Sequence, residues 1–392
     1  MWRPARSAKV AEPNAVGALL GQAIAANPAN ATLHVKLADW HLDRFDFASA
    51  ARSLEQALAL DPRIPGGRER LARCNNSLGR PARAVAALRD LERPHHERAL
   101  ALLALGEGEQ AEAEWRALLA VEPDHRQACR QLARLLRRSG RIAELVALCE
   151  DLAARGVHHS QLLYSWGTAL ALSGQHERAK ALLLDPARVE ELSLPPPCGF
   201  ATIAEFNAAL AEEIVGNPHR LGDFPAADEA NRGSSRVHAL FAGARSELIR
   251  GLLDSLQCVA ERWLPPRYGQ FDPWLDARPA AARLRAWGLI QRGEDYEDWH
   301  LHRGGWLSGV YYVRVPKSIS GEGEGRGCIE FGAPTAVQRG LPGYLPVLRK
   351  VPREGNLLLA PSHYTHRTIP SGLDEYRISF AFDVVPTGGD EG

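Results

Sequence analysis

A repeat in the first half of the chain constrains the fold more than any other feature of the sequence. Four segments share a glycine that is followed, five residues later, by a small or aliphatic residue: SLGRPARAVAAL, ALGEGEQAEAEW, RSGRIAELVALC and LSGQHERAKALL. These residue pairs are Gly79 and Ala84, Gly106 and Ala111, Gly140 and Leu145, and Gly174 and Ala179. An earlier copy has Phe45 in the glycine position and Ala50 in the small position, so that positions 45, 79, 106, 140 and 174 are separated by 34, 27, 34 and 34 residues. A period of this length indicates helical units stacked on one another.

Each unit is predicted to be a pair of antiparallel helices. The glycine permits the turn at a helix end, and the small residue lets the two helices approach closely. Leucine and alanine residues three and four positions apart give each helix one apolar stripe, which a neighbouring unit must help to bury. Over residues 15–186 the pattern resembles the tetratricopeptide repeat family, although several aromatic residues of the family consensus are absent. The resemblance implies a peptide or protein partner bound by the repeats; an irregular helical bundle is the alternative.

Composition bounds the class of protein. A chain of 392 residues is long enough for two domains, and its 47 basic and 47 acidic side chains cancel. Because nucleic-acid-binding proteins usually carry an excess of basic residues, no nucleic acid is expected as a partner. The six cysteines are scattered, as in reduced proteins. With no long apolar stretch and no signal-peptide core in its first sixteen residues, we expect a cytoplasmic protein without a membrane segment.

The second half of the chain has a different texture. A segment with three consecutive prolines, residues 187–199, is predicted to link two domains. Two amphipathic stretches follow it, and from about Arg283 short segments rich in β-branched and aromatic residues alternate with Gly/Pro turns. That pattern is typical of antiparallel β structure. We therefore expect residues 200–387 to form a double-stranded β-helix, or jelly roll, with supporting helices.

Three histidines in the β region have the spacing of a metal site. His300 and His302 lie two residues apart, so that on a strand both side chains project from the same face. His366 follows a short apolar run, GNLLLAPS, that is predicted to be a buried neighbouring strand. Together the three predict a facial triad of ligands. Such a triad leaves three metal positions open, which suffice for a bidentate 2-oxo acid and dioxygen.

A co-substrate site is predicted on the following strand. Arg377 lies 11 residues after His366, and its guanidinium could hold the distal carboxylate of 2-oxoglutarate in a bidentate fork. Ser379 faces the same side of that strand, and Tyr312 lies in mid-strand after the histidine pair. Each of these two side chains could add a hydroxyl hydrogen bond to the same carboxylate.

Taken in order, these fragments resemble the non-haem Fe(II)/2-oxoglutarate oxygenase superfamily over roughly residues 198–387. The most similar group is bacterial and phage, with a histidine pair, a Ser-Gly-Val-Tyr-Tyr strand and Pro-Ser before a distal histidine. Here these features are His300 and His302, Ser308–Tyr312, Pro361-Ser362 and His366, closed by Arg377-Ile378-Ser379. The resemblance implies Fe(II) as the metal, 2-oxoglutarate and dioxygen as co-substrates, and no catalytic side chain beyond the metal site.

The chain departs from the superfamily at one ligand position. Most members have Asp or Glu two residues after the first histidine, where this chain has His302. Since the most similar group tends to have histidine there, three histidines are the first choice. Asp298 and Glu330 are the carboxylate alternatives for this ligand. His363, three residues before His366, is expected to be structural or to line the pocket.

By the resemblance, the chain is an Fe(II)- and 2-oxoglutarate-dependent dioxygenase that hydroxylates a peptide or protein side chain recruited by the repeats. One alternative is an oxygenase for a small or carrier-bound metabolite. The other is a catalytically inactive interaction protein, because fold alone does not fix function. The substrate stays open at this point, as does hydroxylation against desaturation or halogenation.

Overall fold

The computed structural model describes residues 13–197, 199–217, 220–221, 230–237, 246–263, 271–319, 321, 324–332 and 347–387. The chain divides into two compact units between Ser139 and Gly140. We call the described residues up to Ser139 the repeat unit and those from Gly140 onward the sheet unit. In the described part of the chain, no helix is long and apolar enough to cross a membrane.

The repeat unit consists of successive helices in which each contacts the next. In chain order they are α1 (Pro13–Ala26), α2 (Ala31–Leu42), α3 (Phe47–Leu60), α4 (Gly67–Ser77), α5 (Pro81–Ala87), α6 (His96–Ala104), α7 (Gly108–Val121) and α8 (Arg126–Arg138). The predicted small residues Ala50, Ala84 and Ala111 have no exposed surface, which is what close helix pairs require. The shorter step of 27 residues falls on α5, which has 7 residues where α3 and α7 have 14.

The turns of the repeat use the left-handed backbone region. Gly79 and Gly106 have φ angles of 67° and 87°, where a side chain would be unfavourable. Phe45 occupies the equivalent position and has a φ of 58° in spite of its side chain, which is 54% exposed. The fold therefore imposes the glycine conformation at this position, at a cost of about 1–2 kcal/mol.

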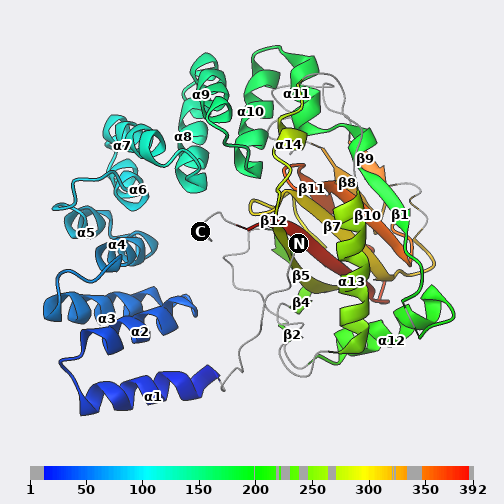
Figure 1. Ribbon diagram of the computed structural model, residues 1–392, viewed down its shortest axis with the longest axis horizontal. Helices are drawn as coiled ribbons and strands as arrows, with labels where there is room; N and C mark the ends of the chain where they lie inside the picture. The colour runs from blue at the N-terminus through cyan, green and yellow to red at the C-terminus, as the bar shows by residue number, and fades with distance from the viewer. Residues whose placement is uncertain are drawn as a thin grey trace. The chain divides into compact units, whose positions relative to one another are not determined.

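The sheet unit joins further helices to antiparallel β structure (Figure 1). Its helices are α9 (Ile142–Ala154), α10 (Ser160–Leu172), α11 (His176–Leu183), the 3-10 turn η1 (Pro186–Arg188), α12 (Ile203–Val215), α13 (Glu247–Arg262) and α14 (Pro273–Asp276). The larger sheet has the order β1 (Glu190–Ser193), β10 (Asn356–Pro361), β7 (Leu307–Arg314), β12 (Arg377–Pro386), β5 (Ala282–Gln291), β4 (Ser235–Val237) and β2 (Arg220–Leu221). A second sheet has the order β11 (His366–Thr368), β8 (Ile329–Phe331) and β9 (Leu348–Lys350), and β3 (Asn231–Arg232) pairs with β6 (Tyr296–Glu297).

The larger sheet is covered on both faces. On one face, Tyr312 and Leu358 share an apolar core cluster with Phe331 of the second sheet. On the other face, helix α12 packs against β7, and the Tyr311 hydroxyl donates a hydrogen bond of 2.7 Å to Asn207 Oδ1. An antiparallel sheet buried between a second sheet and helices agrees with the predicted β domain; closure into a jelly roll stays a prediction.

Strand β1 lies inside the segment that the sequence predicts as a linker. Its residues pair antiparallel with Asn356–Leu359 of β10. Just before it, the buried Arg188 forms an ion pair with Asp272, with distances of 2.8 and 2.5 Å. The prolines begin only after β1, so the strand keeps the N–H groups that the ladder needs.

The last helices of the predicted repeat array belong to the sheet unit. Ser160 Oγ at the start of α10 donates a hydrogen bond of 2.5 Å to the Gly305 carbonyl. The Asp185 N–H, which follows α11, donates one of 3.0 Å to the Tyr364 hydroxyl. These contacts explain why the compact units divide at Ser139 and not at the proline-rich segment. The domain bounds predicted from the sequence pattern, 15–186 for the repeats and 200–387 for the β domain, stay a prediction.

Candidate metal and co-substrate site

The three predicted histidines come together where two irregular segments meet β11. His300 follows β6 and forms a two-way backbone bridge with His366, with N···O distances of 3.0 and 2.9 Å. The His302 N–H donates a hydrogen bond of 3.0 Å to the carbonyl of Ser362, which follows β10. The pair thus lies outside the regular strands, held by one backbone bridge at His300 and one backbone hydrogen bond at His302, where the sequence predicts a strand.

The imidazoles are arranged as a ligand set. One ring nitrogen from each of His300, His302 and His366 lies within 4.8 Å of the others. The ring centroids of His300 and His366 are 4.3 Å apart. The Nε2 atoms of His300 and His302 are 3.3 Å apart, close to the roughly 3 Å between cis ligands that bind one ion through bonds of about 2.1 Å.

Each imidazole is held through its outer nitrogen. Nδ1 of His300 lies 2.7 Å from the Asp298 carbonyl, and Nδ1 of His366 lies 3.1 Å from the Tyr364 carbonyl. A carbonyl can only accept, so each Nδ1 carries the proton and the lone pair of each ring is on Nε2. Burial, followed by the neighbouring imidazoles, holds the pKa of His366 well below its ordinary value, which favours this neutral form. Lone pairs that converge in this way fit a cation, and nitrogen ligands suit Fe(II).

His302 has a carboxylate partner that the sequence analysis missed. Its Nδ1 lies 2.5 Å from Oδ1 of Asp383, which has no exposed surface. The same carboxylate accepts hydrogen bonds from Ser308 Oγ at 2.8 Å and from Arg285 at 2.9 Å. Burial alone would raise the pKa of Asp383, but His302 and Arg285 hold it below its ordinary value. The signal was an acidic residue in the apolar strand FAFDVV, in phase with Arg377 and Ser379.

The two carboxylate alternatives for the third ligand face arginines. Glu330 accepts hydrogen bonds from Arg349 at 2.9 Å and from Arg367 at 2.8 Å. It pairs with Arg367 across the second sheet, whereas His366 pairs with Phe331, so successive side chains carry Glu330 to the other face. The Asp298 carboxylate accepts from the Trp299 N–H and lies 3.8 Å from Arg232.

His363 lies apart from the ligand set. It has no exposed surface, and its ring centroid is 4.9 Å from that of Tyr364 and 6.4 Å from that of Trp274. Burial lowers the pKa of His363 to about 3, so the ring is neutral at physiological pH. Its packing among aromatic rings agrees with the structural role that the sequence suggested.

The predicted co-substrate residues share one face of the larger sheet. Ser379 pairs with Tyr312 on β7, and Arg377 pairs with Gln291 on β5. Arg377 is 5% exposed and donates hydrogen bonds to the Gly327 carbonyl, at 2.6 Å, and to Gln291 Oε1. Burial raises the pKa of Tyr312 to about 12, which keeps its hydroxyl protonated and able to donate. A buried cation, a hydroxyl and a phenol on one face could bind a carboxylate.

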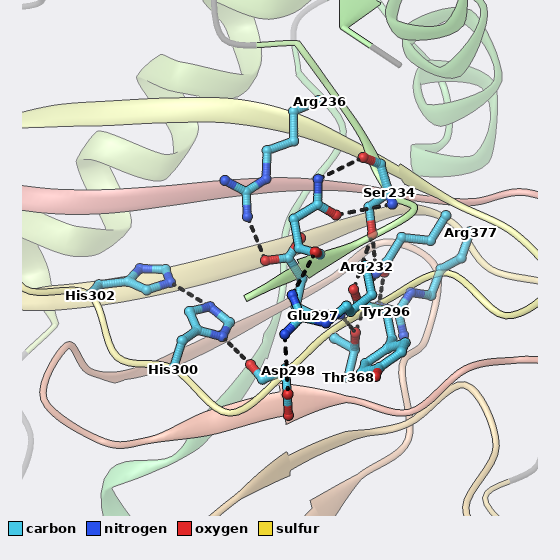
Figure 2. A network of polar contacts seen from close by, with 12 residues as sticks. Arg232, Ser234, Arg236, Tyr296, Glu297, Asp298, His300, His302, Thr368 and Arg377 are labelled. Atoms are coloured by element: carbon cyan, nitrogen blue, oxygen red, sulfur yellow. Dashed lines mark hydrogen bonds and ion pairs between the residues drawn. The ribbon is translucent and has the colours of Figure 1, made fainter. Parts of the chain in front are cut away.

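A polar network connects the histidines to Arg377 (Figure 2). The Asp298 carbonyl accepts a hydrogen bond from Nδ1 of His300. The N–H of the adjacent Glu297 donates a hydrogen bond of 2.8 Å to Thr368 Oγ1. Gln291 Nε2 lies 3.3 Å from the same hydroxyl, and Gln291 in turn accepts from Arg377. The candidate metal site and the candidate carboxylate site are thus two ends of one hydrogen-bonded structure.

The part of the chain that holds the two candidate sites matches a known protein family. Residues 285–383 match the family described as "Putative 2OG-Fe(II) oxygenase". This confirms the resemblance that the sequence motifs indicated. The matched segment begins in β5, ends in β12 and contains the three histidines together with Tyr312, Arg377 and Ser379.

Several solved structures are similar to parts of the chain. A prolyl-4-hydroxylase from Pseudomonas putida is 14% identical, with 54% of this chain and 99% of that chain covered and a TM-score of 0.34. The epimerase SnoN, in a complex with Fe3+, alpha ketoglutarate and nogalamycin RO, is 16% identical over 55% and 84%, with a TM-score of 0.34. YrrB, a TPR protein, is 17% identical over 41% and 86%, with a TM-score of 0.32. No curated protein sequence matches the chain.

Proposed function

We propose that the sheet unit is an Fe(II)- and 2-oxoglutarate-dependent dioxygenase. His300, His302 and His366 would bind the metal. The observation that carries the proposal is the convergence of their ring nitrogens within 4.8 Å, in a segment that matches a 2OG-Fe(II) oxygenase family. When bound, iron supplies the activation of dioxygen, and the 2-oxo acid supplies two of the electrons.

The remaining side chains would orient the metal ligands and bind the co-substrate. The Asp383 carboxylate accepts a hydrogen bond from Nδ1–H of His302, which would direct Nε2 of this ring toward the metal. Arg377, Ser379 and Tyr312 would bind the distal carboxylate of 2-oxoglutarate, with the guanidinium supplying charge and the hydroxyls direction. Because all three are buried, water competes little for the carboxylate.

The substrate proposed is a peptide or protein side chain, which the helical repeats would recruit and the sheet unit would hydroxylate. Repeats of this kind present extended surfaces to polypeptides, so the two parts of the chain have complementary roles under this proposal. Turnover of a small or carrier-bound metabolite, or an interaction protein without catalysis, are the competing proposals.

An anaerobic binding experiment tests the proposal. Fe(II) and 2-oxoglutarate added to the full chain should produce the visible charge-transfer band of a 2-oxo acid bound to iron. Aerobic succinate release that rises on addition of a lysate peptide fraction supports a polypeptide substrate, and release without any peptide supports the small-molecule alternative. Absence of iron binding by the wild-type chain contradicts the enzyme and leaves the interaction protein.

A further inference from the structure

Gln291 is a buried residue of the sheet unit to which the proposed chemistry assigns no role. It ends strand β5, is 3% exposed and lies directly opposite Arg377 in the antiparallel ladder. Its side-chain oxygen accepts a hydrogen bond from Nη2 of Arg377. A glutamine is therefore the residue that fixes one edge of the guanidinium.

The orientation of the Gln291 amide follows from its surroundings. Nε2 donates to Ser234 Oγ at 2.9 Å and to Thr368 Oγ1 at 3.3 Å. If the amide were turned over, its NH2 group would face the guanidinium, which has no acceptor. The carbonyl oxygen therefore faces Arg377, and two hydroxyls hold it there.

The partners of Arg377 are neutral. Its other hydrogen bond goes to the Gly327 carbonyl, and among the described residues it donates to no carboxylate. Glu297 is the acidic residue whose charge acts on the pKa of Arg377, and it forms an ion pair of 2.5 Å with Arg236. Neutral oxygens orient a guanidinium without cancelling its charge. A buried charge in this state is costly unless a ligand compensates it.

We propose that Gln291 is the residue that makes this site selective for a 2-oxo acid with a second carboxylate. Its neutral amide aims Arg377 and leaves the positive charge for the ligand to neutralise. A glutamate at this position would neutralise the guanidinium internally and remove the advantage of the second carboxylate. The inference rests on the proposed function and adds to it a positioning residue and the charge of the co-substrate class.

Two near-isosteric variants of the full chain separate charge from packing. Q291E should bind 2-oxoglutarate on the order of 100-fold more weakly, because its carboxylate competes for Arg377, and should bind 2-oxobutyrate about as well as wild type. Q291M removes the hydrogen bond without adding charge, so that the loss should be about tenfold or less, with the preference for 2-oxoglutarate retained. Both affinities are measured anaerobically by titration calorimetry in the presence of Fe(II).

The controls keep each outcome distinct. Iron affinity should be unchanged in both variants, and the exposed Q127E in the repeat unit should behave as wild type. Equal losses in Q291E and Q291M would mean a merely structural role and overturn the inference, as would wild-type affinity in Q291E. If Q291E does not fold, loss of the preference in Q291M overturns it. A wild-type chain that binds iron but no 2-oxoglutarate overturns the proposed function itself.

Discussion

The repeat unit and the sheet unit depend on sequence at different ranges. In the repeat unit, a buried alanine follows its turn by five residues, and the pattern recurs along the chain, as at Ala50 and Ala84. In the sheet unit, the His302 ring is held by Asp383, 81 residues away. Local contacts recur and can be read from spacing, whereas the candidate site exists only once distant strands have paired.

The difference also concerns tolerance to change. Ala84 lies in an apolar cluster with Ala72, Leu88 and Ala101, so a change there acts on local apolar packing. Asp383 is shared by an imidazole, a hydroxyl and a guanidinium, so a change there acts on three partners at once. We expect substitutions in the sheet unit to be strongly coupled and those in the repeat unit to be nearly additive.

The largest effect is expected at the ligands. H366A should abolish Fe(II) binding, because two imidazoles that remain form an incomplete site. Equilibrium dialysis under anaerobic conditions measures the loss. H176A, which removes an exposed histidine on α11, should bind iron like wild type. Iron bound normally by H366A would refute the assignment of the triad.

Removal of the Asp383 charge beside His302 should have the next largest effect on iron affinity. D383N keeps an acceptor near Nδ1 but loses the negative charge, and we expect iron affinity to fall roughly 10- to 100-fold. The control D374N changes a fully exposed carboxylate of the same unit and should leave the affinity as it is. An unchanged affinity in D383N would show that this carboxylate serves the fold alone.

A smaller and more selective effect is expected at the other end of the network. R377K keeps the charge but loses the bidentate fork, so the KM for 2-oxoglutarate should rise about tenfold while iron affinity stays the same. Succinate formation against 2-oxoglutarate concentration measures it. The matched control is R314K, at an exposed position of the neighbouring strand β7. Wild-type kinetics in R377K would remove the co-substrate assignment.

A substitution in the repeat unit should have the smallest effect on the metal site. It therefore tests most sharply the difference between the repeat unit and the sheet unit. A84L overpacks a buried helix contact and should lower the free energy of unfolding by roughly 1–3 kcal/mol. A86L, at an exposed position of the same helix, should have little effect. Urea denaturation gives both values, and iron affinity should be unchanged in both. A loss of iron affinity in A84L would contradict the independence of the two regions.

The sequence predicts the features that depend on residue spacing or residue type. It does not predict those that arise only when distant strands pair. The period located buried alanines such as Ala111, and the spacing of the histidines selected side chains that the structure brings together. Asp383 and Gln291 escaped because their roles depend on strand register, which no local pattern states. Strand β1 escaped because three prolines beside it suggested a linker.

Strand β1 has a consequence for anyone who dissects the chain. Among the described strands it is the outermost of the larger sheet, and it pairs with the hydrogen-bonding groups of β10. A fragment that began after the prolines, at the apparent domain boundary, would lose this strand together with Arg188, the buried partner of Asp272. The bare edge of the apolar strand NLLLAP would then be open to pairing with other molecules. Aggregation of such a fragment would reflect where it was cut and would say nothing about the stability of the intact chain.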